Sequence, residues 1–208
     1  MADHESPPRA VVLNCTLKRS PEPSNTQALA EVVAKELGDR GVSVEFVRIA
    51  DLNVPPGVKT DLGEGDDWPR VHDLLVNSQI LVVASPTWVG KPSSLAQRVL
   101  ERMDAMLSET DDQGRPVAYN RVAGVVVTGN EDGAHHVISE ISGGLADIGY
   151  TIPGQAWTYW HLGPGPGPNY LDDPKGHEWS AKTGRAMASN LFAVAEALAA
   201  RPVPAPPE

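Results

Sequence analysis

The chain has 208 residues, a length that suits a single domain with a large hydrophobic core. It carries 27 acidic and 17 basic side chains, and the resulting net charge of -10 argues against a general surface for nucleic acid or anionic membranes. The single cysteine, Cys15, excludes an intramolecular disulfide and a cysteine-based metal site. We find no apolar run typical of a signal peptide or membrane span, and therefore expect a cytoplasmic protein without membrane insertion.

Apolar runs alternate with amphipathic segments along the whole chain. In chain order, the pattern predicts a strand at 10–14, a helix at 28–37, a half-exposed strand at 42–49, a short helix from 67, a strand at 80–84, a helix at 93–107, a strand at 122–128, a helix at 137–148, a broken strand within 150–159 and a helix at 179–200. Ser24 or Asn25 would cap the first helix, and Asp66 or Asp67 the second. The apolar spacing also predicts that Leu107 faces inward.

This order of elements predicts the fold. Strands that alternate with helices form right-handed crossovers and a parallel sheet covered on both faces. We therefore predict an α/β, flavodoxin-like three-layer sandwich whose five-stranded parallel sheet has the order 2-1-3-4-5. No internal repeat or linker divides two cores, so residues 1–208 would form one domain, with an ordered core at about 9–201 and proline-rich tails.

Three loops meet at the carboxyl edge of such a sheet, where open α/β sheets bind ligands. The loop at 16–26 offers hydroxyls, an amide, two cations and the amino end of a helix, a combination that suits a phosphate group. The alternative is that Ser24 and Asn25 only cap the helix. The predicted site therefore rests on the other two loops as well.

The second and third loops, at 85–92 and 128–133, combine glycines with a proline and Trp88. Glycines permit close backbone approach and an aromatic ring can cover a planar face, so these loops suit a heteroaromatic ring. The alternatives are that Trp88 belongs to the ordinary core and that Glu131 and Asp132 are solvated or capping charges.

Several other motifs are absent or incomplete. No G-x-G-x-x-G follows the first strand, and Pro92 stands where a Walker A motif needs Ser or Thr. Residues 84–86 do not form a nucleophile elbow. His135 and His136 are adjacent, so on a helix they point about 100° apart, unlike a metal-binding pair four residues apart. We therefore predict no metal site.

The segment Ser85-Pro86-Thr87-Trp88-Val89-Gly90 resembles the S-P-x-Y/W-x-G motif of the NADPH-dependent FMN reductase family, which includes NAD(P)H:quinone reductases and iron-sulfur relatives. The resemblance spans roughly residues 11–160. Its other carriers are Ser24-Asn25-Thr26, Asp51-Leu52-Asn53, Asp66-Asp67, Arg102-Met103-Asp104 and Thr128-Gly129-Asn130-Glu131. Two departures are the inserted Pro21-Glu22-Pro23 and the lack of cysteines between 53 and 66, which excludes an iron-sulfur cluster.

Carried over by position, the resemblance implies a complete FMN site. The residues that would bind the phosphate are Thr16, Lys18, Ser24, Asn25 and Thr26. Those that would border the isoalloxazine ring are Pro86, Thr87, Trp88, Val89 and Gly90 on one side, and Thr128, Gly129, Asn130 and Gly133 on the other. Since flavin carries the chemistry, no acid-base residue is required. The catalytic residues stay open, with Trp88 and His161 as candidates and packing as the alternative for His161.

The resemblance further implies an enzyme that transfers a hydride from NADPH or NADH to FMN, and then reduces a quinone, free flavin or similar small acceptor. It also implies a homodimer or homotetramer. The alternative functions are a non-catalytic flavodoxin-like electron carrier and a flavin-binding sensor. The long Gly/Pro-rich segment at 162–176 favours an enzyme, because such a loop can cover a small-molecule substrate.

Overall fold

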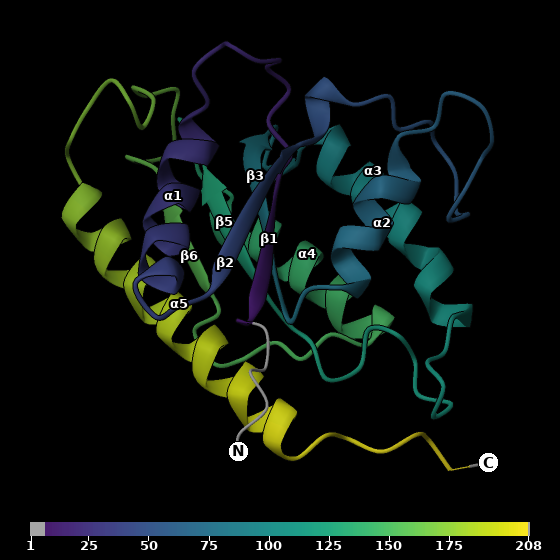
Figure 1. Ribbon diagram of the computed structural model, residues 1–208. Coiled ribbons are helices and arrows are strands. Elements are labelled where there is room, and N and C mark those ends of the chain that lie inside the picture. The colour runs from purple at the N-terminus through teal and green to yellow at the C-terminus, as the bar shows by residue number, and fades with distance from the viewer. Residues whose placement is uncertain (1–6, 208) are drawn as a thin grey trace.

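The computed structural model describes residues 7–207 and has three layers, a sheet between two layers of helices (Figure 1). The strands are β1 (Arg9–Asn14), β2 (Ser43–Arg48), β3 (Ile80–Trp88), β4 (Lys91–Pro92), β5 (Val122–Thr128) and β6 (Trp157–Trp160). The α-helices are α1 (Asn25–Gly38), α2 (Trp68–Val76), α3 (Ser94–Met103), α4 (Ala134–Ile148) and α5 (His177–Ala200), with 3₁₀ turns at Ile49–Asp51 and Asp104–Ser108. Most of the predicted N-terminal tail lies outside the described residues.

The parallel strands follow the order β2-β1-β3-β5-β6. This confirms the predicted flavodoxin-like order, in which strands one, three and four are central. β5 is buried along its whole length, as expected for a β-branched strand covered on both faces. β2 is mostly exposed and lies at one edge, as its alternating sequence predicted.

Side chains of each strand alternate between two hydrophobic cores. Val11 and Leu13 of β1 belong to the core beneath α2, α3 and α4, whereas Val12 belongs to the core beneath α1 and α5. The same period-two alternation continues in β3, where Leu81 and Val82 point to opposite cores. In Figure 1, α1 and α5 accordingly lie on one side of the sheet and α2, α3 and α4 on the other.

Several boundaries differ from the predicted ones. β3 does not end at Ala84 but continues to Trp88, because its last residues pair with the short antiparallel strand β4. The prediction that Leu107 faces inward is wrong: α3 ends at Met103 and a 3₁₀ turn follows, so the tighter pitch leaves Leu107 49% exposed. The last predicted strand is regular only at 157–160, after an isolated bridge at Thr151.

Within residues 7–207, we find no helix with the length and apolar character needed to span a membrane.

Candidate functional site

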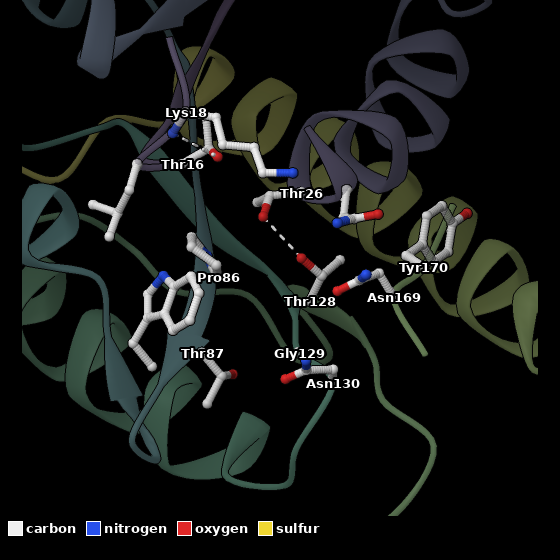
Figure 2. Close-up of a pocket in the computed structure, with 13 residues that line it drawn as sticks. Thr16, Lys18, Thr26, Pro86, Thr87, Thr128, Gly129, Asn130, Asn169 and Tyr170 are labelled. Atoms are coloured by element: carbon white, nitrogen blue, oxygen red, sulfur yellow. Dashed lines mark hydrogen bonds between the residues drawn. The ribbon is translucent and has the colours of Figure 1, made fainter. Parts of the chain in front are cut away.

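A cleft opens at the carboxyl ends of β1, β3 and β5, where the three loops meet (Figure 2). It encloses about 590 Å³ of empty volume, part of it open to solvent. The lining residues are Thr16, Leu17, Lys18, Asn25, Thr26, Pro86, Thr87, Trp88, Thr128, Gly129, Asn130, Asn169 and Tyr170.

One end of the cleft is formed by the first loop and the amino end of α1. Ser24 caps the helix by accepting a hydrogen bond from the Gln27 backbone N–H at 3.1 Å, and no acidic side chain lies in the first turn. Lys18 also lines the cleft here. A helix amino end stabilises a bound anion by about 0.3–1 kcal/mol at an exposed site, and the ammonium group of Lys18 adds to this. This end therefore suits a phosphate group.

Asn14, at the end of β1, holds the first loop in place through side-chain hydrogen bonds. Its carboxamide nitrogen donates to Ser24 Oγ at 3.4 Å and to Gln27 Oε1 at 3.2 Å, while its oxygen accepts from the Thr16 backbone N–H at 3.2 Å. Asn14 is buried, so these bonds satisfy polar groups that solvent does not reach. The loop is thus held to the sheet at both of its ends.

The other end of the cleft is a slot between β3 and the loop after β5. Trp88 lines it while 52% exposed, which rules out the ordinary-core alternative. In the loop after β5, a Cβ on Gly129 would lie 2.9 Å from the Glu131 carbonyl oxygen and 3.1 Å from Thr87 Cβ, so no side chain fits there. The buried Thr87 hydroxyl has no hydrogen-bond partner among the described residues. An unsatisfied hydroxyl in the wall, next to a glycine that permits close approach of a ligand, suits a ring with polar atoms.

Four of the predicted site residues do not line the cleft. Ser24 is occupied as a helix cap, and Val89 is 90% exposed at the hairpin tip. A Cβ on Gly133 would lie 2.9 Å from Gly90 Cα, which shows that these two glycines pack against each other, and neither lines the cleft. From the sequence alone, we considered Glu131 as a solvated or capping charge. In the structure its carboxylate accepts a hydrogen bond from the Gly90 N–H at 3.2 Å and so connects the second and third loops.

Sequence reasoning missed Leu17, Asn169 and Tyr170. The last two belong to residues 162–176, which we call the strap. The strap joins β6 to α5, and the Gly167 N–H donates to the Asn130 carbonyl oxygen at 2.7 Å. The Tyr170 ring stacks on His177 with centroids 3.9 Å apart. Its Gly/Pro composition indicated a covering loop, but composition does not show which of its residues reach the cleft.

His161 lies outside the cleft. Its ring stacks on Tyr159 at 5.5 Å, and its Nδ1 accepts from the Gly163 N–H at 3.2 Å. His135 packs edge-on against Tyr159, and His136 pairs with Glu140 at 3.0 Å. Over residues 7–207, no group of three or more His, Cys, Asp or Glu side chains is placed to hold a metal ion. The packing alternative for His161 therefore fits the structure better than a catalytic role.

Other motif residues that carry the resemblance have structural partners. Asp66 forms a fully buried ion pair with Arg102 at 2.6 Å, and Arg102 also donates to the carbonyl oxygens of Pro55, Lys59 and Thr60. Burial raises the pKa of Asp66, but hydrogen bonds from Arg102 and from two backbone N–H groups outweigh it and hold this pKa below its usual value. The pair fixes the loop before α2.

The sequence pattern of the NADPH-dependent FMN reductase family matches residues 8–161, which is most of the chain. The chain belongs to this family. It is 34% identical over 206 residues to the 8-demethyl-8-aminoriboflavin-5'-phosphate synthase of Streptomyces davaonensis, a match that covers 93% of this chain and 79% of the synthase. It is also 37% identical over 199 residues to the divalent metal cation transporter MntH of Mycobacterium bovis, but that match covers 92% of this chain and only 29% of the transporter.

Solved structures share the fold of this chain. RosB with the bound intermediate 8-demethyl-8-formylriboflavin-5'-phosphate superimposes with a TM-score of 0.85 and 32% identity, covering 94% of this chain and 82% of RosB. The NADH:FMN oxidoreductase EMOB shares the fold, with a TM-score of 0.61 and 15% identity, over 93% of this chain and 91% of EMOB.

Membership of the FMN reductase family implies FMN as the cofactor and NADPH or NADH as the reductant, within a family of oxidoreductases. The cleft fits FMN in its chemistry. The end that Lys18 and the amino end of α1 form can take the phosphate, and the end that Trp88 and Gly129 line can take the ring, with the unsatisfied Thr87 hydroxyl in its wall.

Proposed function

We propose that this FMN reductase family member is an FMN-dependent NAD(P)H oxidoreductase that reduces a small acceptor such as a quinone or free flavin. The observation that carries the proposal is the cleft itself, which combines a helix amino end with a wall formed by Trp88, Thr87 and Gly129 at the carboxyl edge of the sheet. Bound FMN would supply the redox chemistry, by accepting a hydride from NAD(P)H and passing two electrons to the acceptor.

The protein's own part is to bind and orient the flavin. We assign the phosphate to Thr16, Lys18, Asn25 and Thr26, and the ring to Pro86–Trp88 and Thr128–Asn130. Ser24, Gly90 and Gly133 act indirectly, by fixing the shapes of the loops that make these contacts. Because Trp88 is half exposed, its indole can cover one face of the ring without a large change in the core.

Absorbance spectroscopy tests this function directly. The purified protein is saturated with FMN, freed of excess flavin, and mixed anaerobically with NADH or NADPH. We expect rapid bleaching of the flavin band and its recovery on addition of a quinone or free flavin. Bleaching only through a separate reductase would instead support the electron-carrier alternative, and a protein that binds no FMN would contradict both functions.

A second candidate is an enzyme that alters the flavin itself. The supporting observation is the 34% identity, over 93% of this chain, to a protein named as a synthase of an aminoriboflavin phosphate. Mass spectrometry of the flavin after many turnovers separates the two functions. An unchanged FMN mass supports the reductase, whereas conversion of FMN into a product of different mass supports a flavin-modifying enzyme.

We also propose that the protein forms a homodimer or homotetramer. Leu17, Trp88 and Val89 are 47%, 52% and 90% exposed near the mouth of the cleft, and such apolar groups are commonly covered by a partner. Light scattering at micromolar concentration measures the oligomeric state. A strictly monomeric protein would contradict the proposal.

A further inference from the structure

Three asparagines line the cleft, Asn25, Asn130 and Asn169, and the protein fixes the orientation of the carboxamide in Asn25 and in Asn169. The Leu171 backbone N–H, in the strap, donates to Asn25 Oδ1 at 2.9 Å. A backbone N–H can only donate, so Oδ1 must be the end of the carboxamide that meets it. The donor end of Asn25, Nδ2, is therefore left to serve the cleft at the amino end of α1.

Asn169 is fixed in the opposite sense. Its Nδ2 donates to the Asp172 carboxylate at 2.7 Å, and an ionised carboxylate can only accept. The acceptor end, Oδ1, is left for a ligand, and Figure 2 shows the Asn169 carboxamide at the wall of the cleft beside Thr128. The cleft thus presents one oriented donor and one oriented acceptor, from two segments far apart in the sequence.

The neighbours of Asn169 hold it in place before any ligand arrives. The Gly167 N–H is bonded to the Asn130 carbonyl oxygen at 2.7 Å, and the Tyr170 carbonyl oxygen accepts from His177 Nε2 at 2.7 Å. Stacking of Tyr170 on His177 adds to this anchoring. A side chain that is already ordered loses little further entropy on binding, so its hydrogen bond contributes more fully to affinity.

We propose that Asn169 is a specificity residue that accepts a hydrogen bond from a hydroxyl of the flavin's ribityl chain, while Asn25 donates to its phosphate. This inference rests on the proposed FMN site and adds to it. A phosphate offers only acceptors to a donor such as Asn25 Nδ2, whereas a sugar-alcohol hydroxyl can donate to Asn169 Oδ1. Asn169 also lies beyond residues 8–161, the part that matches the family pattern. The proposed hydrogen bond to the ribityl chain therefore comes from the strap and not from the matched segment.

Three flavins separate the two contacts. FMN carries both the ribityl chain and the phosphate, riboflavin carries only the chain, and lumiflavin carries neither. Affinity for each is measured by flavin fluorescence or calorimetry on the full chain. For Asn169→Ala, we expect FMN and riboflavin to bind about 5- to 10-fold more weakly and lumiflavin to bind unchanged, since one hydrogen bond is lost.

The matched control is Asn190→Ala, which removes a half-buried carboxamide of α5 that donates to the Gly154 carbonyl oxygen at 2.7 Å and does not line the cleft. All three affinities should stay at wild-type values in this variant. The ribityl assignment would be overturned if Asn169→Ala weakened the binding of lumiflavin as much as the binding of riboflavin, or if it changed none of the three affinities.

Asn25→Asp tests the phosphate half. The variant keeps an oxygen to accept from the Leu171 N–H but replaces the donor with a negative charge. We expect FMN affinity to fall at least about 10-fold and riboflavin affinity to stay within about twofold, because only the phosphate is repelled. Equal losses for both flavins, or no loss for FMN, would overturn this half. Wild-type protein that binds none of the three flavins would instead refute the proposed function itself.

Discussion

The hydroxyl oxygens of Thr26 and Thr128 lie 2.8 Å apart at the back of the cleft. Thr26 belongs to the first turn of α1 and Thr128 ends β5, so one hydrogen bond joins the phosphate end of the site to the loop that carries Gly129. Both side chains are almost completely buried. The bond therefore ties two segments 102 residues apart at the point where both meet the ligand.

Replacement of either threonine by valine tests this link. Thr26→Val or Thr128→Val leaves the other hydroxyl buried without its partner, which we expect to cost about 1–3 kcal/mol of unfolding free energy. The double variant should lose less unfolding free energy than the two single variants lose in sum, because neither hydroxyl is then left without its partner. Urea unfolding of the four proteins measures the coupling. Strictly additive losses would show that the two hydroxyls do not depend on each other.

Trp88→Ala addresses the ring end. The indole is 52% exposed, so we expect a stability loss below about 1 kcal/mol together with weaker FMN binding or altered turnover. Trp68 is fully buried and provides the matched control, since Trp68→Ala should cost about 3–5 kcal/mol. Thermal unfolding and FMN titration are measured on both variants. A large stability loss in Trp88→Ala with unchanged flavin chemistry would contradict the proposed contact between Trp88 and the flavin ring.

Gly129→Ala addresses the close approach of the third loop. The added Cβ would lie 2.9 Å from the Glu131 carbonyl oxygen, so backbone must shift at the wall of the cleft. We expect reduced FMN affinity and a stability loss of about 1–3 kcal/mol. Gly143 of α4 has open space around it, and Gly143→Ala should instead stabilise the protein by about 0.5–1 kcal/mol. If both variants behaved alike in unfolding and FMN titration, the steric argument would fail.

The buried pair of Asp66 and Arg102 predicts a response to acid. Because the folded-state pKa of Asp66 lies below its ordinary value of 3.8, this carboxylate stabilises the fold above that value. The stabilisation is lost as pH falls from the ordinary pKa to the lower folded-state pKa. Unfolding free energy measured from pH 7 down to the onset of acid unfolding should therefore decline more steeply in wild type than in Asp66→Asn.

At neutral pH, Asp66→Asn leaves the Arg102 charge buried without a counterion, and we expect a loss of about 3–5 kcal/mol. Glu36→Gln is the control: Glu36 pairs with Arg40 at 3.0 Å on the surface, where such pairs contribute about 0–1 kcal/mol. Similar losses of unfolding free energy in the two variants would show that burial does not determine how much the ion pair of Asp66 and Arg102 contributes to stability.

Much of the fold follows from local pattern. The β-branched run at 122–128 has no polar alternation, which requires a strand covered on both faces, and Ser24 precedes a helix that it caps as predicted. The order of the strands follows because right-handed crossovers allow few arrangements of alternating strands and helices. The boundary errors at Ala84 and Leu107 arose where pairing with β4 and a 3₁₀ turn overrode the local signal.

The sequence by itself determined the sheet and the three loops at its carboxyl edge, because period-two and helical patterns and turn residues are local properties of the chain. Only the tertiary structure decided which side chains reach the cleft. Val89 turns outward at the tip of a hairpin, whereas Asn169 and Tyr170 enter from a strap about 40 residues after the third loop. The hydrogen bonds that place them, from Leu171 to Asn25 and from Gly167 to Asn130, join segments whose distance in space no local pattern encodes.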